Sequence, residues 1–275
     1  RRRTFLAKQQ QRQQRSNRAG KPSLVARAAR AAAVPDGGGG ASADGVSDRT
    51  LGITALLLGI FITVFLLWKN HKPPGMGFYE YNLVNLAMVF WLPLTVTMLF
   101  LRREPAEVGM VVGDAKKGTL VALILFALFV PVLIFVAPMQ GPQDYYTRWF
   151  LNSGLLRGVS WDGRTYTGGY LHWESLIAHE VVMAFYMFGW EWYHRGFLLN
   201  GMKRIMPVWA AVGVQALFFM ALHLKKPGLE MLSSLPGGIF MGWLALRYRS
   251  FLPCFVLHFL VSAGFDAAVL YYRFR

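Results

Sequence analysis

Ionisable residues occur within the apolar C-terminal part of this sequence, whereas the first three long apolar runs contain essentially none. A charged side chain inside a membrane span is energetically costly, so it is by default a candidate functional residue. We therefore expect any chemistry to reside in residues 171–275. The ionisable residues in the apolar stretches of this region are His179, Glu180, Glu191, His194, Arg195, His223, His258 and Asp266.

Two of these residues, Glu191 and Arg195, are four positions apart, so on a helix they share one face and can form an ion pair. The next apolar run ends in His223, and a turn is predicted near Pro207 between the two runs. Glu191 and His223 are each 16 residues from Pro207. In an antiparallel pair of helices, equal spacing from the turn places two side chains at the same depth. We expect Glu191 and His223 to face each other inside the protein.

A metal ion is an alternative use of the same residue types. We predict no cofactor, but glutamate and histidine are ligands that zinc accepts, and this alternative stays open. The residues that would hold the ion are Glu191, His223 and His258. The pair His179-Glu180 begins like the zinc motif H-E-x-x-H, but the fifth position is Met183, which excludes that motif.

Three ionisable residues carry expectations about position. Glu180 precedes Glu191 by eleven residues, or three helical turns, so it either lines the same cavity or bonds an arginine or a loop where the helix begins. We favour the second of these. Asp266 is expected near the membrane surface and in contact with solvent. His258 follows its preceding turn by only a few residues, so counting alone places it at a different depth from His223.

Three short motifs within residues 170–275 resemble those of the CPBP family, the membrane proteins that include the type II CAAX-prenyl endopeptidases and the bacteriocin-processing proteins. The motifs of that family are E-E-x-x-x-R, F-x-x-x-H and H-x-x-x-N. The sequence WEWYHRGFLL at 190–199 resembles the first motif, FMALH at 219–223 the second, and HFLVS at 258–262 the third. The order of the motifs and the spacing between them also fit.

The resemblance implies hydrolysis of peptide bonds within the membrane. In the family, a motif carboxylate activates water as a general base, and motif histidines polarise the carbonyl or stabilise the oxyanion. The catalytic residues implied for this chain are Glu191, His223 and His258. The supporting residues are Arg195, Phe219, Ser262 and Glu180.

This chain departs from the family pattern at two positions. Trp190 replaces the first glutamate, the expected general base, and Ser262 replaces the final asparagine. An indole has no basic site, so catalysis would require Glu191 to leave Arg195 and act from a position about 100° around the helix. Two functions stay open. One is an intramembrane endopeptidase for proteins or prenylated proteins; the other is a non-catalytic subunit, assembly factor or scaffold of a membrane protein complex.

The elements that must position these residues are predicted to be membrane-spanning helices. Runs of about 18–22 apolar residues match the thickness of a bilayer, and helices satisfy their own backbone polar groups there. We predict an all-α, polytopic transmembrane bundle of about seven spans with a CPBP-type core. A Pro-Gly-Gly sequence at 236–238 interrupts the sixth run and either opens a lateral cavity or lets helices pack closely. The runs are Leu51–Trp68, Tyr81–Leu101, Leu120–Pro138, Leu171–Met202, Pro207–Leu224, Met231–Leu246 and Phe251–Tyr272.

Composition separates the chain into five segments. It has 275 residues, of which 55% are apolar and 16% are charged, far fewer charges than in an average soluble protein. The segments are an organellar transit peptide (1–34), a flexible linker (35–50), N-terminal transmembrane helices (51–140), an interfacial aromatic loop (141–170) and a CPBP-like core (171–275).

The formal net charge of +15 is concentrated at the N-terminus. Residues 1–35 contain ten basic and no acidic residues, a composition typical of organellar transit peptides, and the run 24–35 resembles the processing region of chloroplast transit peptides. We predict a chloroplast membrane, thylakoid or inner envelope, with a mitochondrial membrane as the second possibility. A retained basic arm that binds anionic lipid or RNA is the remaining alternative.

Beyond residue 50 the basic surplus is only seven (18 basic less 11 acidic), spread over loops, so we expect no nucleic-acid partner. The expected partners are membrane lipids and a membrane protein substrate or complex. The single cysteine, Cys254, excludes an internal disulfide. Basic residues in alternate loops place these loops and the N-terminus on one side of the membrane. They are Arg102, Arg103, Lys116, Lys117, Lys203, Arg204, Arg247 and Arg249.

Overall fold

The computed structural model describes residues 46–72, 75–139, 145–161, 166–224 and 226–273. These residues belong to one structural unit, residues 41–275. The predicted transit peptide and most of the predicted linker lie outside the described residues, so their boundaries stay predictions.

Helices form most of the described chain, as the apolar runs predict. The α-helices are α3 (Asp48–His71), α4 (Phe78–Leu86), α5 (Leu92–Thr95), α6 (Ala115–Val136), α7 (Tyr145–Asn152), α8 (Trp173–Glu191), α9 (Leu199–Met202), α10 (Val208–Ala221), α11 (Gly228–Tyr248) and α12 (Leu252–Arg273). Short π-helical segments are η1 (Ala87–Trp91), η2 (Val96–Phe100) and η5 (Trp192–Leu198). Single 3-10 turns are η3 (Pro105–Val108) and η4 (Ala137–Met139).

The prediction of an all-α polytopic bundle is confirmed. Within the described residues, five helical rods are long and apolar enough to cross a membrane. Helix α10 has 14 residues and is shorter than a full span, while α8, η5 and α9 form one continuous rod that carries the polar residues. Large apolar side chains such as Leu128 and Phe135 point outward from α6, which indicates contact with lipid. The five rods are Asp48–His71, Phe78–Phe100, Ala115–Met139, Gly228–Tyr248 and Leu252–Tyr272.

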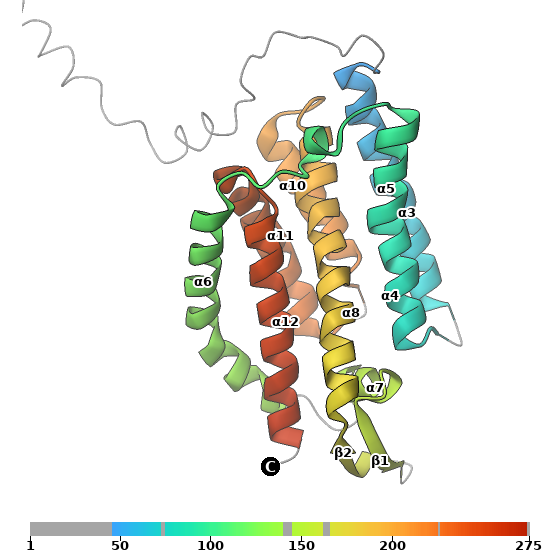
Figure 1. Cartoon of the computed structure of the whole chain (residues 1–275), viewed down its shortest axis with the longest axis vertical. Coiled ribbons are helices and arrows are strands. Elements are labelled where there is room, and N and C mark those ends of the chain that lie inside the picture. The colour runs from blue at the N-terminus through green and yellow to red at the C-terminus, as the bar shows by residue number, and fades with distance from the viewer. Residues whose placement is uncertain (1–45, 73–74, 140–144, 162–165, 225, 274–275) are drawn as a thin grey trace, which may run out of the picture. The chain divides into compact units, whose positions relative to one another are not determined.

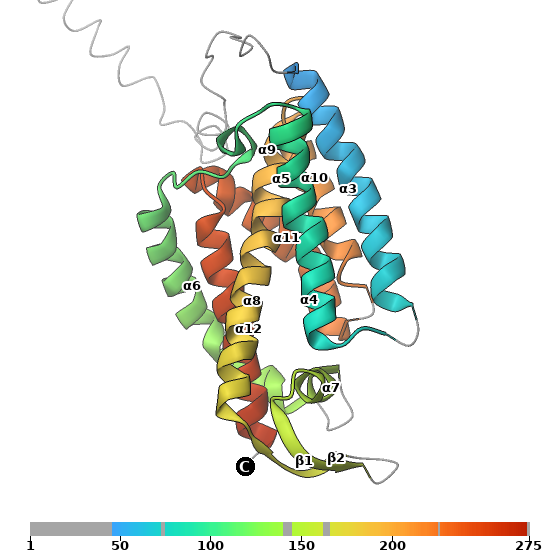
Figure 2. The same ribbon diagram turned by 45° about the vertical axis from the view of Figure 1, so that its right-hand side comes forward.

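Helices α8 and α12 run side by side through the bundle and carry most of the predicted site (Figure 1). Helix α6 packs along α12, and α4 packs against α8. Helices α10 and α11 form an antiparallel pair that contacts η5 (Figure 2). The start of α3 and the turns that precede α6, α10 and α12 lie at one end of the unit, so the predicted basic loops share one side (Figure 1).

A network of ion pairs holds together the end of the bundle that carries these turns. Arg103 pairs with Asp48 at 3.1 Å and with Glu107 at 2.6 Å. Arg204, in the turn after α9, also pairs with Asp48 and donates to the carbonyl of Glu107. Because these residues belong to three different segments, the network fixes the start of α3 against the loop before α6 and the turn before α10.

The aromatic segment 141–170 is partly regular. It contains α7 and an antiparallel hairpin of β1 (Leu156–Trp161) and β2 (Tyr166–Leu171), which directly precedes α8. The hairpin is an addition to the predicted all-α fold, and it lies beyond the apolar helices at the far end of the unit from the basic turns (Figure 1). Residues 140–144 and 162–165 of the predicted loop lie outside the described residues.

The prediction that Pro236 interrupts its span is wrong, because α11 is continuous from Gly228 to Tyr248. Close packing of α10 against α11 is the alternative that the structure supports. A Cβ atom at Gly238 would lie 3.1 Å from the Cβ of Ala216, tighter than ordinary contact, whereas a Cβ at Gly237 would meet nothing within 4 Å. Small residues allow membrane helices to approach in this way.

Replacing Gly238 by valine is expected to destabilise the protein, because the added atoms must push α10 and α11 apart. Overpacking of this kind costs about 1–3 kcal/mol. Thermal unfolding of the purified protein in detergent measures the effect. Gly237→Val is the matched control, since it alters helix propensity equally without meeting a neighbour; equal melting temperatures for the two variants would contradict the packing.

Candidate active site

The end of α8 and the π-helix η5 carry the first motif into the centre of the bundle. Every residue from 189 to 199 is buried, including Glu191 at 0% exposure and Arg195 at 1%. Glu191 is the last residue of α8, and η5 begins at the next position. Widened π-helical turns occur often at functional sites, so the local backbone is consistent with a specialised role for this segment.

Glu191 is the centre of the polar contacts. Its Oε1 accepts a hydrogen bond of 2.6 Å from Nδ1 of His258 on α12. Its Oε2 lies 3.2 Å from Nε of Arg195, so the predicted ion pair forms, although the direction of approach makes no hydrogen bond. A buried carboxylate is expensive unless it is paired, and here one cation and one imidazole share that task.

Arg195 is held by a residue that the sequence analysis did not select. Its Nη1 donates to Oε1 of Gln215 at 2.9 Å, and Nε2 of Gln215 donates to the carbonyl of Gly238 at 2.9 Å. The guanidinium carbon also lies 4.4 Å from the ring centre of Phe219, a cation–π contact. A lone glutamine in the apolar helix α10 was the available signal for this positioning role.

The histidines have defined tautomers because their partners can only accept. Nδ1 of His223 donates to the carbonyl of Phe219 at 2.7 Å, and Nδ1 of His194 donates to the carbonyl of Trp190 at 2.9 Å. In the neutral ring each Nε2 is then a proton acceptor. Nε2 of His194 is buried and makes no hydrogen bond within the described residues.

The side chain of Trp190, in the first motif, packs against residues of the second motif. Its ring lies 5.9 Å from the rings of both His223 and Phe219 and 4.7 Å from the ring of His194. The structure therefore differs from the expectation that Glu191 faces His223: the preceding residue, Trp190, lies against His223 instead. The equal spacing from Pro207 brings the two helices together at this depth, but the indole of Trp190 meets His223, while Glu191 turns toward α12.

His258 reaches Glu191 although counting alone placed it at a different depth from His223. The contact does not come from a break in α11, which is continuous. The turn before α10 extends further along the bundle than the turn before α12 (Figure 1). His258, seven residues after the turn that precedes α12, therefore lies at the same depth as Glu191, sixteen residues before Pro207 in the turn that precedes α10.

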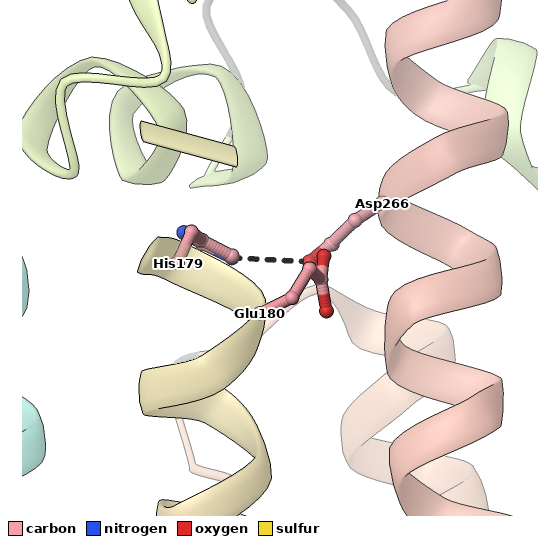
Figure 3. A group of neighbouring side chains, drawn as sticks. All are labelled: His179, Glu180 and Asp266. Atoms are coloured by element: carbon pink, nitrogen blue, oxygen red, sulfur yellow. Dashed lines mark hydrogen bonds and ion pairs between the residues drawn. The ribbon is translucent and has the colours of Figure 1, made fainter. Parts of the chain in front are cut away.

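Two predicted supporting residues lie apart from this group. Ser262 is half-buried one turn beyond His258 and makes no hydrogen bond to a side chain in the described part of the protein. Glu180 neither joins Glu191 nor bonds an arginine; it lies with His179 and Asp266 between α8 and α12 (Figure 3). The expectation that Asp266 is solvated is wrong, since it is 4% exposed and 3.3 Å from Nε2 of His179.

Glu191, His223 and His258 do not form a compact metal-binding group. The group of His, Cys, Asp and Glu side chains found among the described residues with ligand atoms within 4.8 Å of one another is His179, Glu180 and Asp266. The alternative of a metal at the motif residues is therefore not supported by their arrangement. These residues instead combine a paired carboxylate with two imidazoles whose Nε2 atoms can accept protons.

The fold and site together define a polytopic helical membrane protein with a buried group of Glu191, Arg195 and His258. A family model described as "Type II CAAX prenyl endopeptidase Rce1-like" matches residues 172–264. This part of the chain is thus an Rce1-like domain of the CPBP family, and the predicted resemblance is confirmed. No curated protein and no solved structure matched the chain.

Removal of one partner of the buried ion pair is expected to destabilise the protein strongly. Glu191→Leu leaves the Arg195 charge uncompensated, and the loss of one member of a buried pair costs about 3–5 kcal/mol. The combination of Glu191→Leu with Arg195→Met is expected to cost clearly less than the sum of the two single changes. Unfolding of all three variants in detergent measures the coupling; additive free energies would show that the pair does not interact.

Proposed function

We propose that this protein is an intramembrane peptide-bond hydrolase in which His258, oriented by Glu191, activates the attacking water. The proposal rests chiefly on the hydrogen bond of 2.6 Å between Nδ1 of His258 and Oε1 of Glu191. A carboxylate in this position fixes the imidazole tautomer and stabilises the imidazolium that forms, as in Ser-His-Asp hydrolases. Nε2 of His258 is then free to accept a proton.

His258 is suited to the role of base by its exposure. Its side chain is 19% exposed, whereas the side chain of Glu191 is fully buried. Water that reaches the group therefore meets His258 and not Glu191. This assignment does not require Glu191 to leave Arg195, which the replacement of the first motif glutamate by Trp190 otherwise demands.

In the proposed reaction, Nε2 of His258 takes a proton from water while the oxygen attacks the peptide carbonyl. Nε2 of His223 accepts the second hydrogen of that water and thereby orients it. The protonated His258 then returns its proton to the leaving amine. Arg195 keeps Glu191 ionised beside the imidazolium, and Gln215 keeps Arg195 in place. The substrate class is a membrane-embedded protein segment, including the prenylated C-termini after which the family is named.

A non-catalytic role is the second candidate, and a specific observation favours it. Trp190 occupies the family's general-base position and packs its ring against His223 and Phe219. An indole there can fill space that a water would otherwise take. In this role the protein would bind a membrane protein segment and act as a subunit, assembly factor or scaffold of a complex.

Two substitutions, at Trp190 and at His258, test the hydrolase proposal against the non-catalytic role. Trp190→Glu is expected to raise hydrolysis of a fluorogenic prenylated peptide in proteoliposomes, since a positioned general base contributes about 10²–10⁴-fold. His258→Gln is expected to reduce the wild-type rate by a similar factor. The readout is kcat/KM for the prenylated peptide.

Trp190→Gln is the matched control, because it places a side chain of similar shape to glutamate without a basic oxygen. A wild-type rate indistinguishable from that of His258→Gln would overturn the hydrolase proposal. Normal accumulation and an unchanged phenotype for Glu191→Ala and His223→Ala, together with a stoichiometric partner, would favour the non-catalytic role.

We also propose that the protein resides in a chloroplast membrane, on the composition of residues 1–35. A fusion of residues 1–50 to a fluorescent protein is expected to enter isolated chloroplasts and to be shortened near residue 34. A variant with the ten basic residues of this segment changed to glutamine is the control and is expected to stay outside. Import into mitochondria alone would contradict the assignment.

A further inference from the structure

A second polar cluster lies between α8 and α12, away from the motif residues. His179 and Glu180 come from α8 and Asp266 from α12, and one ligand atom from each lies within 4.8 Å of the others. Figure 3 shows the two carboxyl groups converging at the end of the imidazole. Glu180 precedes Glu191 by eleven residues, which is about 16 Å along a helix, so this cluster is separate from the candidate active site.

We propose that His179, Glu180 and Asp266 bind a divalent transition-metal ion of the zinc class. The sequence H-E at 179–180 lacks the second histidine of the H-E-x-x-H motif, and the fold brings Asp266 to it from α12 as a third ligand. One imidazole and two carboxylates suit zinc, iron or manganese, whereas calcium and magnesium prefer oxygen ligands alone. Three protein ligands leave a fourth position for water.

The separation of two of the ligand atoms fits this role. Nε2 of His179 and Oδ2 of Asp266 are 3.3 Å apart. Two ligands bound tetrahedrally at about 2.0–2.1 Å from zinc are about 3.3–3.4 Å from each other. A charge-assisted hydrogen bond is shorter, about 2.7–2.9 Å. The observed separation equals that of two ligands of one ion and is long for a direct charge-assisted contact between the two side chains.

The polar atoms of the cluster are incompletely satisfied without an ion. His179 is 0% exposed and Asp266 is 4% exposed. Oε2 of Glu180 is buried and makes no hydrogen bond to any residue that the structure describes. When ionised, the two carboxylates place negative charge in an apolar bundle, and a divalent cation would neutralise it.

The residues around the cluster orient it but supply little net positive charge to balance its carboxylates. The imidazole of His179 stacks on Phe78 at 4.5 Å, with an angle of 17° between the rings, which fixes its orientation. Lys226 and Glu230 lie near enough to act electrostatically on Asp266. They also pair with each other at 2.7 Å, so together they add little net charge. A bound ion would tie α8 to α12 below the candidate active site.

The test is metal retention by the full-length protein purified in detergent. The protein is incubated with zinc chloride, or in parallel with manganese chloride, then desalted, and the metal per chain is measured by mass spectrometry. We expect about one zinc ion per chain in the wild type and at least a tenfold loss of affinity in His179→Gln and Asp266→Asn. Manganese in place of zinc would support the same site with a different ion of the class.

Two further variants keep the test decisive. Glu180→Gln changes a partly exposed side chain, so it is expected to fold and still to bind zinc more weakly. Glu191→Gln is expected to retain zinc, because it alters the candidate active site and not this cluster. Cobalt(II) bound to the wild type is expected to show the visible absorption of a tetrahedral site, and Glu180→Gln to change that spectrum.

The proposal is overturned if the wild type retains neither zinc nor manganese. It is equally overturned if the three cluster variants, eluting as monodisperse protein, bind as tightly as the wild type, or if Glu191→Gln alone loses the ion. Loss of hydrolysis in Glu191→Gln with full zinc retention would leave this inference standing independently of the proposed function.

Discussion

The burial of Glu191 is the constraint on which the rest of the site depends. A carboxylate with no exposed surface must be paired, and the two partners come from different places: Arg195 one turn along the same rod and His258 on α12. This requirement draws α12 against η5. It also extends outward, because Arg195 in turn needs Gln215 on α10, and Gln215 needs the carbonyl of Gly238 on α11.

Small residues make this polar chain possible. Gly238 and Gly242 let α11 approach α10 closely enough for Gln215 to reach across, since a side chain at either glycine would meet Ala216, Val212 or Gln215 itself. Close approach and hydrogen bonding are the main sources of helix association where lipid is as apolar as the helices. Close approach at small residues and hydrogen bonding between helices therefore both pack the bundle and position the site.

Several parts of the site were predictable from the sequence. The three motifs follow from the resemblance to the CPBP family. The Glu191–Arg195 pair and the meeting of the first two motif helices follow from helical periodicity and from spacing around one turn. Which member of Trp190-Glu191 meets His223 was not predictable, because it depends on how the rod rotates about its axis. The partners of Gln215 were not predictable either, because a single polar residue in an apolar run indicates a polar contact but does not show which residue forms it.

By itself, the sequence determined the class of the protein: an all-α membrane bundle with rare charged residues in its C-terminal part, of which residues 172–264 match an Rce1-like family model. Only the tertiary structure decided the depth at which separate helices meet. The turn before α10 extends beyond the turn before α12, and this offset brings His258 to Glu191 and Asp266 to His179 and Glu180. Such offsets arise from packing among many helices, so no local pattern in one run can encode them.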